Sequence, residues 1–122
     1  MGRLMDKMRL WLRDNRQITM EEYDDLVREY YDLRMSLIKK YRENRDMWYM
    51  EWRRLERENK PRPHSYEKFI SLKMSELARK MTKQEKYRLN LDVQEHGNDG
   101  FYIYAKAKNW PDTMIGMVYY GG

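Results

Sequence analysis

The side chains that most often perform catalysis are scarce in this chain of 122 residues, which contains no Cys and two His, His64 and His96. The lack of Cys excludes a thiol nucleophile, a disulfide framework, a zinc ribbon and an iron–sulfur cluster. Neither His belongs to a His-x-x-x-His or His-Glu pair with metal-ligand spacing. We therefore expect both imidazoles to be exposed to solvent, and we predict a protein that is not an enzyme and that uses no cofactor and no metal.

One acidic cluster has the composition of a divalent-cation site. Residues 21–32 carry six carboxylates beside a single Arg, and the six are Glu21, Glu22, Asp24, Asp25, Glu29 and Asp32. The cluster occupies the first turns of an expected helix, where carboxylates complement the positive end of the helix dipole. We favour this structural role over a metal site.

Basic and aromatic side chains alternate in the C-terminal half, and this pattern favours a binding function. The odd positions from Phe101 to Ala107 are apolar, so the even positions share the other face of an expected strand, namely Tyr102, Tyr104, Lys106 and Lys108. Arg88 and Asn90 join that face from the preceding strand. Aromatic and basic side chains on an open sheet can stack nucleobases and neutralise phosphates. Further bases could extend this surface from a nearby helix: Lys73, Arg79, Lys80 and Lys83. The alternative is an ordinary solvent-facing strand, or a face covered by a helix.

Three helices are expected to position these side chains. The first is amphipathic and covers residues 3–16. The second, over about 19–59, starts at a capping box of Thr19 and Glu22 and contains neither Gly nor Pro. Its apolar periodicity weakens at residues 42–46, but we favour one continuous helix. The third covers about 65–81, with Ser65 as its N-cap.

The second helix is about 60 Å long at about 1.5 Å per residue, so we expect it to project from a chain of this size. A projecting apolar face needs a partner. We therefore predict a homodimer, or another protein partner, on this interface: Tyr23, Val27, Tyr30, Leu37, Tyr41, Trp48, Trp52 and Leu55. The helix is acidic over 21–32 and basic over 33–60, which fits either pairs within the helix or antiparallel pairing with a basic helix.

The end of the chain changes to the alternating period of strands. We predict an antiparallel three-stranded meander, with a three-residue loop Asn98-Asp99-Gly100 in its first hairpin and a last strand from Met114 to Tyr120. The loop places Asp92 opposite Lys106. The fold class is thus α+β, with a helical arm over 1–60 and a helix plus sheet over 61–122, together in one compact unit.

Charge and hydropathy bound the remaining possibilities. The 25 basic and 20 acidic residues give a net charge of +5, which alone is too modest to imply nucleic acid. Neither a signal peptide nor a membrane span is recognisable, so we expect a soluble cytoplasmic protein with no membrane partner. In size, composition and expected α+β architecture the chain is similar in style to small accessory or inhibitor proteins of phages and mobile elements, such as anti-CRISPR proteins. We expect a protein that docks on nucleic acid or a nucleoprotein enzyme complex; the alternative is a dimerisation or protein–protein module that makes no nucleic-acid contact.

Overall fold

The computed structural model describes residues 19–97, 100–110 and 114–120 of the chain. These residues form helices α2 (Met20–Arg57) and α3 (Tyr66–Thr82), followed by strands β1 (Leu89–His96), β2 (Gly100–Ala107) and β3 (Met114–Tyr120). The predicted combination of helices with a C-terminal antiparallel sheet is confirmed. The helix predicted over residues 3–16 lies outside the described residues, so two of the three predicted helices are found in the described part of the chain.

Helix α2 starts at the predicted capping box. The Thr19 hydroxyl accepts a hydrogen bond from the backbone N–H of Glu22 at 3.1 Å and donates one to the Glu22 carboxylate at 3.0 Å. The helix then runs for 38 residues without interruption, including residues 42–46. Shortly after its end, Asn59 adopts the left-handed region with φ of 51°, which turns the chain back toward α3. No helix among the described residues is both long and apolar enough to cross a lipid bilayer.

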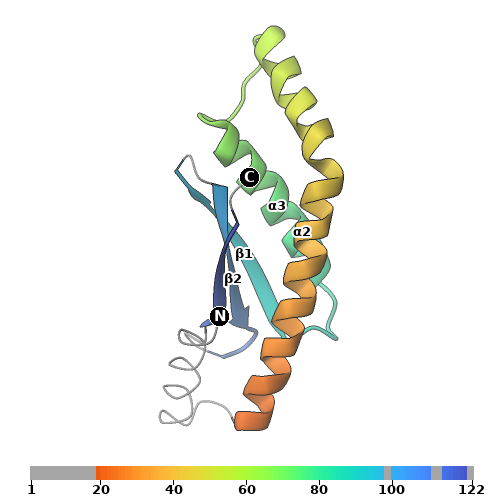
Figure 1. The fold of residues 1–122 in the computed structure, drawn as a ribbon, viewed down its shortest axis with the longest axis vertical. Coiled ribbons are helices and arrows are strands. Elements are labelled where there is room, and N and C mark those ends of the chain that lie inside the picture. Colours follow the sequence, from red (N-terminus) through yellow and green to blue (C-terminus); the bar gives the residue numbers. More distant parts are fainter. Residues whose placement is uncertain (1–18, 98–99, 111–113, 121–122) are drawn as a thin grey trace.

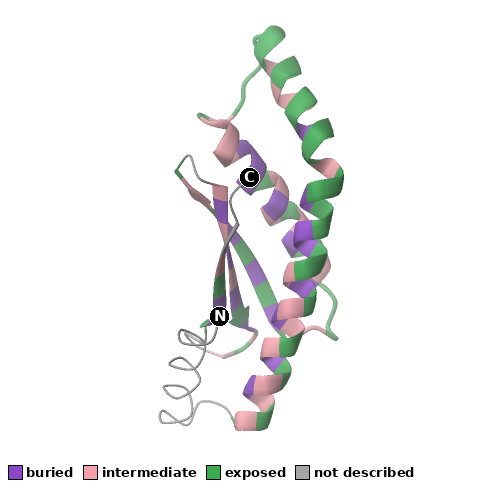
Figure 2. Cartoon of the chain, viewed as in Figure 1, coloured by how far each residue is buried: buried purple, intermediate pink, exposed green. Residues whose placement is uncertain are grey.

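The apolar row of α2 forms the core of the protein. Tyr30 is 1% exposed and Leu37 is 0% exposed, and Figure 2 shows buried residues along the side of α2 that faces α3 and the sheet. The prediction that this row is an interface for another protein is therefore wrong for five of its members, which the chain itself covers: Tyr23, Tyr30, Leu37, Tyr41 and Trp48. The reason is that α3 and the sheet lie along α2 (Figure 1), which helical periodicity cannot reveal.

The last turns of α2 extend beyond the sheet (Figure 1), so the projecting arm is shorter than predicted. Trp52, a member of the predicted interface on these turns, is also covered from within the chain. The Trp52 ring lies 5.4 Å from the Phe69 ring and 5.8 Å from the Tyr66 ring, between centroids. The Arg62 guanidinium lies 4.3 Å from the centroid of the Trp52 indole. The other members of the predicted interface, Val27 and Leu55, are half-buried and pack against the same core.

Helix α3 confirms the helix predicted over about 65–81. The Ser65 hydroxyl caps it by accepting a hydrogen bond from the backbone N–H of Lys68 at 3.1 Å. Its apolar side packs mainly on β1 and lines the space between sheet and α2 with Phe69, Ile70, Met74 and Ala78. Core residues thus come from both predicted segments, 1–60 and 61–122.

The three strands form an antiparallel meander in the order β1-β2-β3, as predicted. Both helices lie on one side of this sheet (Figure 1). The odd-numbered side chains from Leu89 to Val93 and from Phe101 to Ala107 face the helices and are buried. The even-numbered side chains therefore occupy the opposite face.

The first hairpin turns one residue earlier than predicted. His96 pairs with Gly100, which leaves residues 97–99 between the strands. Gly97 adopts a φ of 51° at the start of this connection, a conformation that glycine reaches at little cost. Asp92 consequently lies opposite Tyr104, and the predicted pairing of Asp92 with Lys106 is wrong. Odd residues still pair with odd ones, so the predicted division of side chains between the two faces is kept.

Candidate functional site

The face of the sheet opposite the helices carries neighbouring aromatic rings. Tyr102 and Tyr104 alternate with buried residues of β2 and are themselves half-buried, so they point away from the core as predicted. Their ring centroids lie 6.0 Å apart. Lys106 continues the same row and is exposed. Both described helices lie on the other side of the sheet (Figure 1).

His96 adds a third ring to this row. Its Nε2 lies 3.2 Å from the Tyr102 hydroxyl, and the two ring centroids are 4.3 Å apart. The expectation that His96 is simply exposed is wrong, because the ring is half-buried against Tyr102. The alternation of β1 contains the signal for this position, since His96 follows Asn90, Asp92 and Gln94 on the even-numbered face.

Strand β3 contributes two exposed methionines. Met117 pairs with Tyr104 and is 39% exposed, and Met114 pairs with Lys106 and is 41% exposed. A register irregularity between Ala105 and Lys106 places an extra β3 residue between these pairs. Methionine side chains are flexible and polarisable, so they form an adaptable apolar border to the aromatic row.

The charges on this face are few and of both signs. Lys106 provides a positive charge, and Asp92 on the neighbouring strand provides a negative one. The Asp92 carboxylate accepts a hydrogen bond from the Gln94 side-chain amide at 2.9 Å. The face therefore favours contacts through rings and methionines, with little attraction from its net charge.

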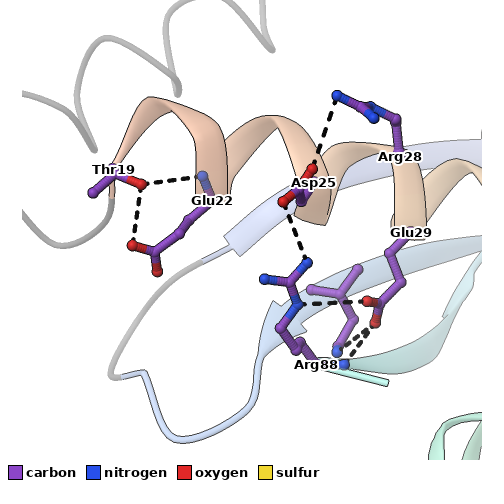
Figure 3. Close-up of polar contacts among 7 residues, drawn as sticks. Thr19, Glu22, Asp25, Arg28, Glu29 and Arg88 are labelled. Carbon is purple, nitrogen blue, oxygen red and sulfur yellow. Dashed lines mark hydrogen bonds and ion pairs between the residues drawn. The ribbon is translucent and has the colours of Figure 1, made fainter. Parts of the chain in front are cut away.

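Arg88 does not join the aromatic row, contrary to the prediction. It precedes β1, and its guanidinium turns toward α2, where it lies 3.8 Å from the Asp25 carboxylate and 3.9 Å from the Glu29 carboxylate (Figure 3). Glu29 also accepts the backbone N–H groups of Arg88 at 2.8 Å and of Leu89 at 2.9 Å. These contacts assign Arg88 to the attachment of β1 to α2.

Lys108 is also engaged within the chain. Its ammonium donates hydrogen bonds to the backbone carbonyl oxygens of Thr82 and Gln84 at the C-terminal end of α3. A cation at this position complements the negative end of the helix dipole. The prediction that Lys108 extends the row of Lys106 is therefore wrong.

The predicted extension of the surface through α3 is wrong as well, because α3 packs on the opposite side of the sheet. Lys73 lies 3.2 Å from the Glu51 carboxylate of α2, and Lys80 lies 3.9 Å from Glu76. Arg79 and Lys83 are exposed, but they belong to α3 and the segment that follows it. The bases of α3 therefore lie on the side of the sheet away from Tyr102 and Tyr104 (Figure 1).

The acidic cluster of α2 has structural partners. The Glu22 carboxylate accepts a hydrogen bond from the Thr19 hydroxyl, Asp25 lies 3.8 Å from Arg28, and Glu29 accepts the backbone N–H of Leu89 at the start of β1. Within the described ranges, no three His, Asp or Glu side chains are arranged so that they could hold a metal ion. The carboxylates are thus used for helix capping and for attachment of the sheet.

Two hollows lie beside Tyr87 and Arg88, and each is balanced in charge. One has a volume of about 230 Å³ and is lined by acidic and basic side chains, Glu22, Glu85, Arg88 and Lys108. The other is more open, with a volume of about 430 Å³, and its charged lining is Asp25, Glu29, Asp32, Arg28, Lys86 and Arg88. Neither hollow concentrates one sign of charge, as a phosphate or cation site does.

His64 lies in a small cluster around Glu95. The Glu95 carboxylate is 3.3 Å from His64 Nε2 and accepts a hydrogen bond from the Ser65 hydroxyl at 2.8 Å. Because the Ser65 oxygen also caps α3, this hydroxyl has a structural role rather than that of a nucleophile activated by His64. The His64 side chain is 72% exposed, as expected.

Comparison of the chain with protein-family models, with curated proteins and with solved structures finds no match. The assignment of function therefore depends on the geometry of the sheet face.

Proposed function

We propose that this protein binds single-stranded nucleic acid on the open face of its sheet, either free or within a nucleoprotein complex, and that it acts by binding without catalysis. The observation that carries the proposal is the row of rings formed by His96, Tyr102 and Tyr104 on the side of the sheet opposite the two described helices (Figure 1). An accessory or inhibitor role follows if this face binds a nucleic-acid strand that a nucleoprotein enzyme must also bind.

The spacing of the rings favours unpaired bases. With centroids 4.3 Å and 6.0 Å apart, the three rings contact one another, so bases would stack on their outward surfaces rather than between them. Bases in a duplex are already stacked, whereas single strands can present their faces to such a surface. Each stack on an aromatic side chain contributes about 1–3 kcal/mol.

The charges of the face imply a shallow dependence on salt. Arg88 and Lys108 are engaged elsewhere, which leaves Lys106 as the base beside the rings. One phosphate contact to a single strand contributes about −0.7 to the slope of log affinity against log salt. Binding should therefore depend more on stacking than on counterion release.

Fluorescence anisotropy with labelled single-stranded and duplex probes tests the proposal. The wild-type protein should prefer the single strand, and Tyr102→Ala/Tyr104→Ala should lose affinity at every salt concentration. Tyr49→Ala is the matched control, because Tyr49 is a 46% exposed tyrosine on α2 and should be neutral. If the wild-type protein binds neither probe at about 50 mM salt, where electrostatic attraction is strong, the proposal is wrong.

Lys106→Ala tests the contribution of charge. This variant should weaken binding and reduce the salt slope by about 0.7. Lys80→Ala removes the same charge from an ammonium on α3 and should leave both affinity and slope unchanged. Equal losses in the two variants would mean that binding follows overall charge instead of the sheet face.

A further inference from the structure

The side of α2 that faces away from the sheet carries a second regular row of side chains. We call it the outer stripe, and its members are Asp32, Met35, Lys39, Arg42, Glu43, Asp46, Met50 and Arg53. Steps of three and four residues, with Arg42 and Glu43 adjacent at the centre, keep these positions on one side of a helix, opposite the buried row. All eight are exposed, and Met35 and Met50 are 55% and 60% exposed. Figure 2 shows this exposed side along the length of α2.

Over residues 32–53 the outer stripe is complementary to its own reverse, and the next exposed positions on this side, Arg28 and Arg57, form a like-charged pair in the same register. When a second α2 runs antiparallel, with a two-fold axis between Arg42 and Glu43, these two residues face each other across the pair. The same operation places Met35 opposite Met50. It also brings together three pairs of opposite charges, each of which occurs twice because of the two-fold axis. These pairs are Asp32 with Arg53, Lys39 with Asp46, and Arg42 with Glu43. An isologous interface requires such self-complementarity.

Two other arrangements of the same helices oppose like charges. A parallel pair in register would place Asp32, Lys39 and Asp46 each opposite itself. An antiparallel pair shifted by one heptad would place Asp46 opposite Asp32 in one direction and opposite itself in the other. Like charges in direct opposition disfavour both of these arrangements. A parallel pair staggered by one heptad would also oppose unlike charges, but its two surfaces are not equivalent, so it does not close into a two-fold dimer.

We propose that the outer stripe binds a second copy of this chain, as an antiparallel helix pair centred between Arg42 and Glu43. The occupant is identified by charge complementarity along the stripe. The pair uses two Met35–Met50 contacts and exposed ion pairs, so the dimer is weak and sensitive to salt. It uses the side of α2 that faces away from the sheet (Figure 1), so it does not depend on whether the aromatic face of the sheet binds nucleic acid.

Charge reversal at one pair gives a direct test by sedimentation equilibrium at about 50 mM salt, where exposed charges are little screened. Asp32→Arg alone and Arg53→Asp alone each oppose like charges at two symmetry-related contacts, so each should raise the dimer dissociation constant about tenfold or more. An equimolar mixture of these two variants restores both opposite pairs and should form a heterodimer with an affinity close to that of the wild type. The double variant Asp32→Arg/Arg53→Asp should likewise recover.

Arg45→Asp is the matched control, because Arg45 is exposed on α2 but lies outside the outer stripe. It changes the net charge as Arg53→Asp does and should dimerise like the wild type. Far-UV circular dichroism checks that each variant is folded. The proposal is wrong if the wild-type chain remains monomeric up to about 1 mM, the weakest affinity worth calling specific, or if the mixture dimerises no better than the single variants.

Discussion

The ring of Tyr30 on α2 lies directly against the backbone of Gly116 on β3. A Cβ atom at Gly116 would lie 2.9 Å from Tyr30 Cε2, closer than such atoms approach without a shift. This contact sets the distance between the long helix and the last strand, because the glycine leaves room for the aromatic ring.

Gly116→Ala should therefore lower the free energy of unfolding by about 1–3 kcal/mol, the usual cost of overpacking a core. The same substitution in a Tyr30→Leu background should cost less, since the ring that it meets is gone. Urea denaturation of the four proteins measures the coupling between the two positions. An equal cost in both backgrounds would show that the contact does not limit the packing.

Tyr30→Phe should leave the protein equally stable or raise its free energy of unfolding by about 1 kcal/mol. The Tyr30 hydroxyl is buried and has no hydrogen-bond partner among the described residues, so the substitution removes a desolvated polar group and keeps the ring. Thermal denaturation measures the effect. A loss larger than about 1 kcal/mol would indicate that this hydroxyl is hydrogen-bonded in solution.

The stability of the protein should fall in alkaline solution in a manner that depends on Tyr30. Burial raises the pKa of the Tyr30 phenol well above its ordinary value of about 10. The unfolded chain then loses this proton first, so the stabilisation is complete below about pH 10 and declines as the pH rises further. Tyr30→Phe should lose less stability than the wild type between about pH 9 and pH 11, as measured by urea denaturation. Parallel declines in the two proteins would contradict this assignment.

Glu29→Ala should lower the free energy of unfolding by about 2–3 kcal/mol. The Glu29 carboxylate accepts the backbone N–H groups of Arg88 and Leu89, and the substitution leaves these donors without their acceptor. Asp25→Ala is the control, because its ion pair with Arg88 is half-exposed and should contribute less than about 1 kcal/mol. Equal losses for the two variants, measured by urea denaturation, would mean that the ion pairs matter more than the backbone hydrogen bonds.

The helix starts and the strands were predictable from the sequence, because each depends on residues that are close together along the chain. Thr19 and Glu22 identify the start of α2, Ser65 identifies the start of α3, and alternation identifies β1 and β2 and the outward direction of Tyr102 and Tyr104. Each of these signals acts through contacts within one turn of helix or along one strand, so the sequence contains all the information that they need.

The candidate site was predictable only in part. Tyr102, Tyr104 and Lys106 share one face as expected, but the one-residue difference in the hairpin sets which β1 residues lie beside them. The predicted hairpin would place His96 directly opposite Tyr102, whereas the observed register pairs Gln94 with Tyr102 and leaves His96 in the diagonal position, from which its ring still contacts Tyr102. Arg88 and Lys108 share the same alternation, yet each has its partners on a helix far away in the sequence.

By itself the sequence determined the two described helices, the strands, the capping residues and the parity of the sheet, because local geometry repeats with a fixed period. Only the tertiary structure decided which side of α2 is covered. The row from Tyr23 to Trp48 is apolar enough for either a partner or a core, and it forms the core because α3 and the sheet pack against it. The tertiary structure also decided which charged side chains pair, since an ion pair such as Arg88 with Glu29 joins residues that only folding brings together.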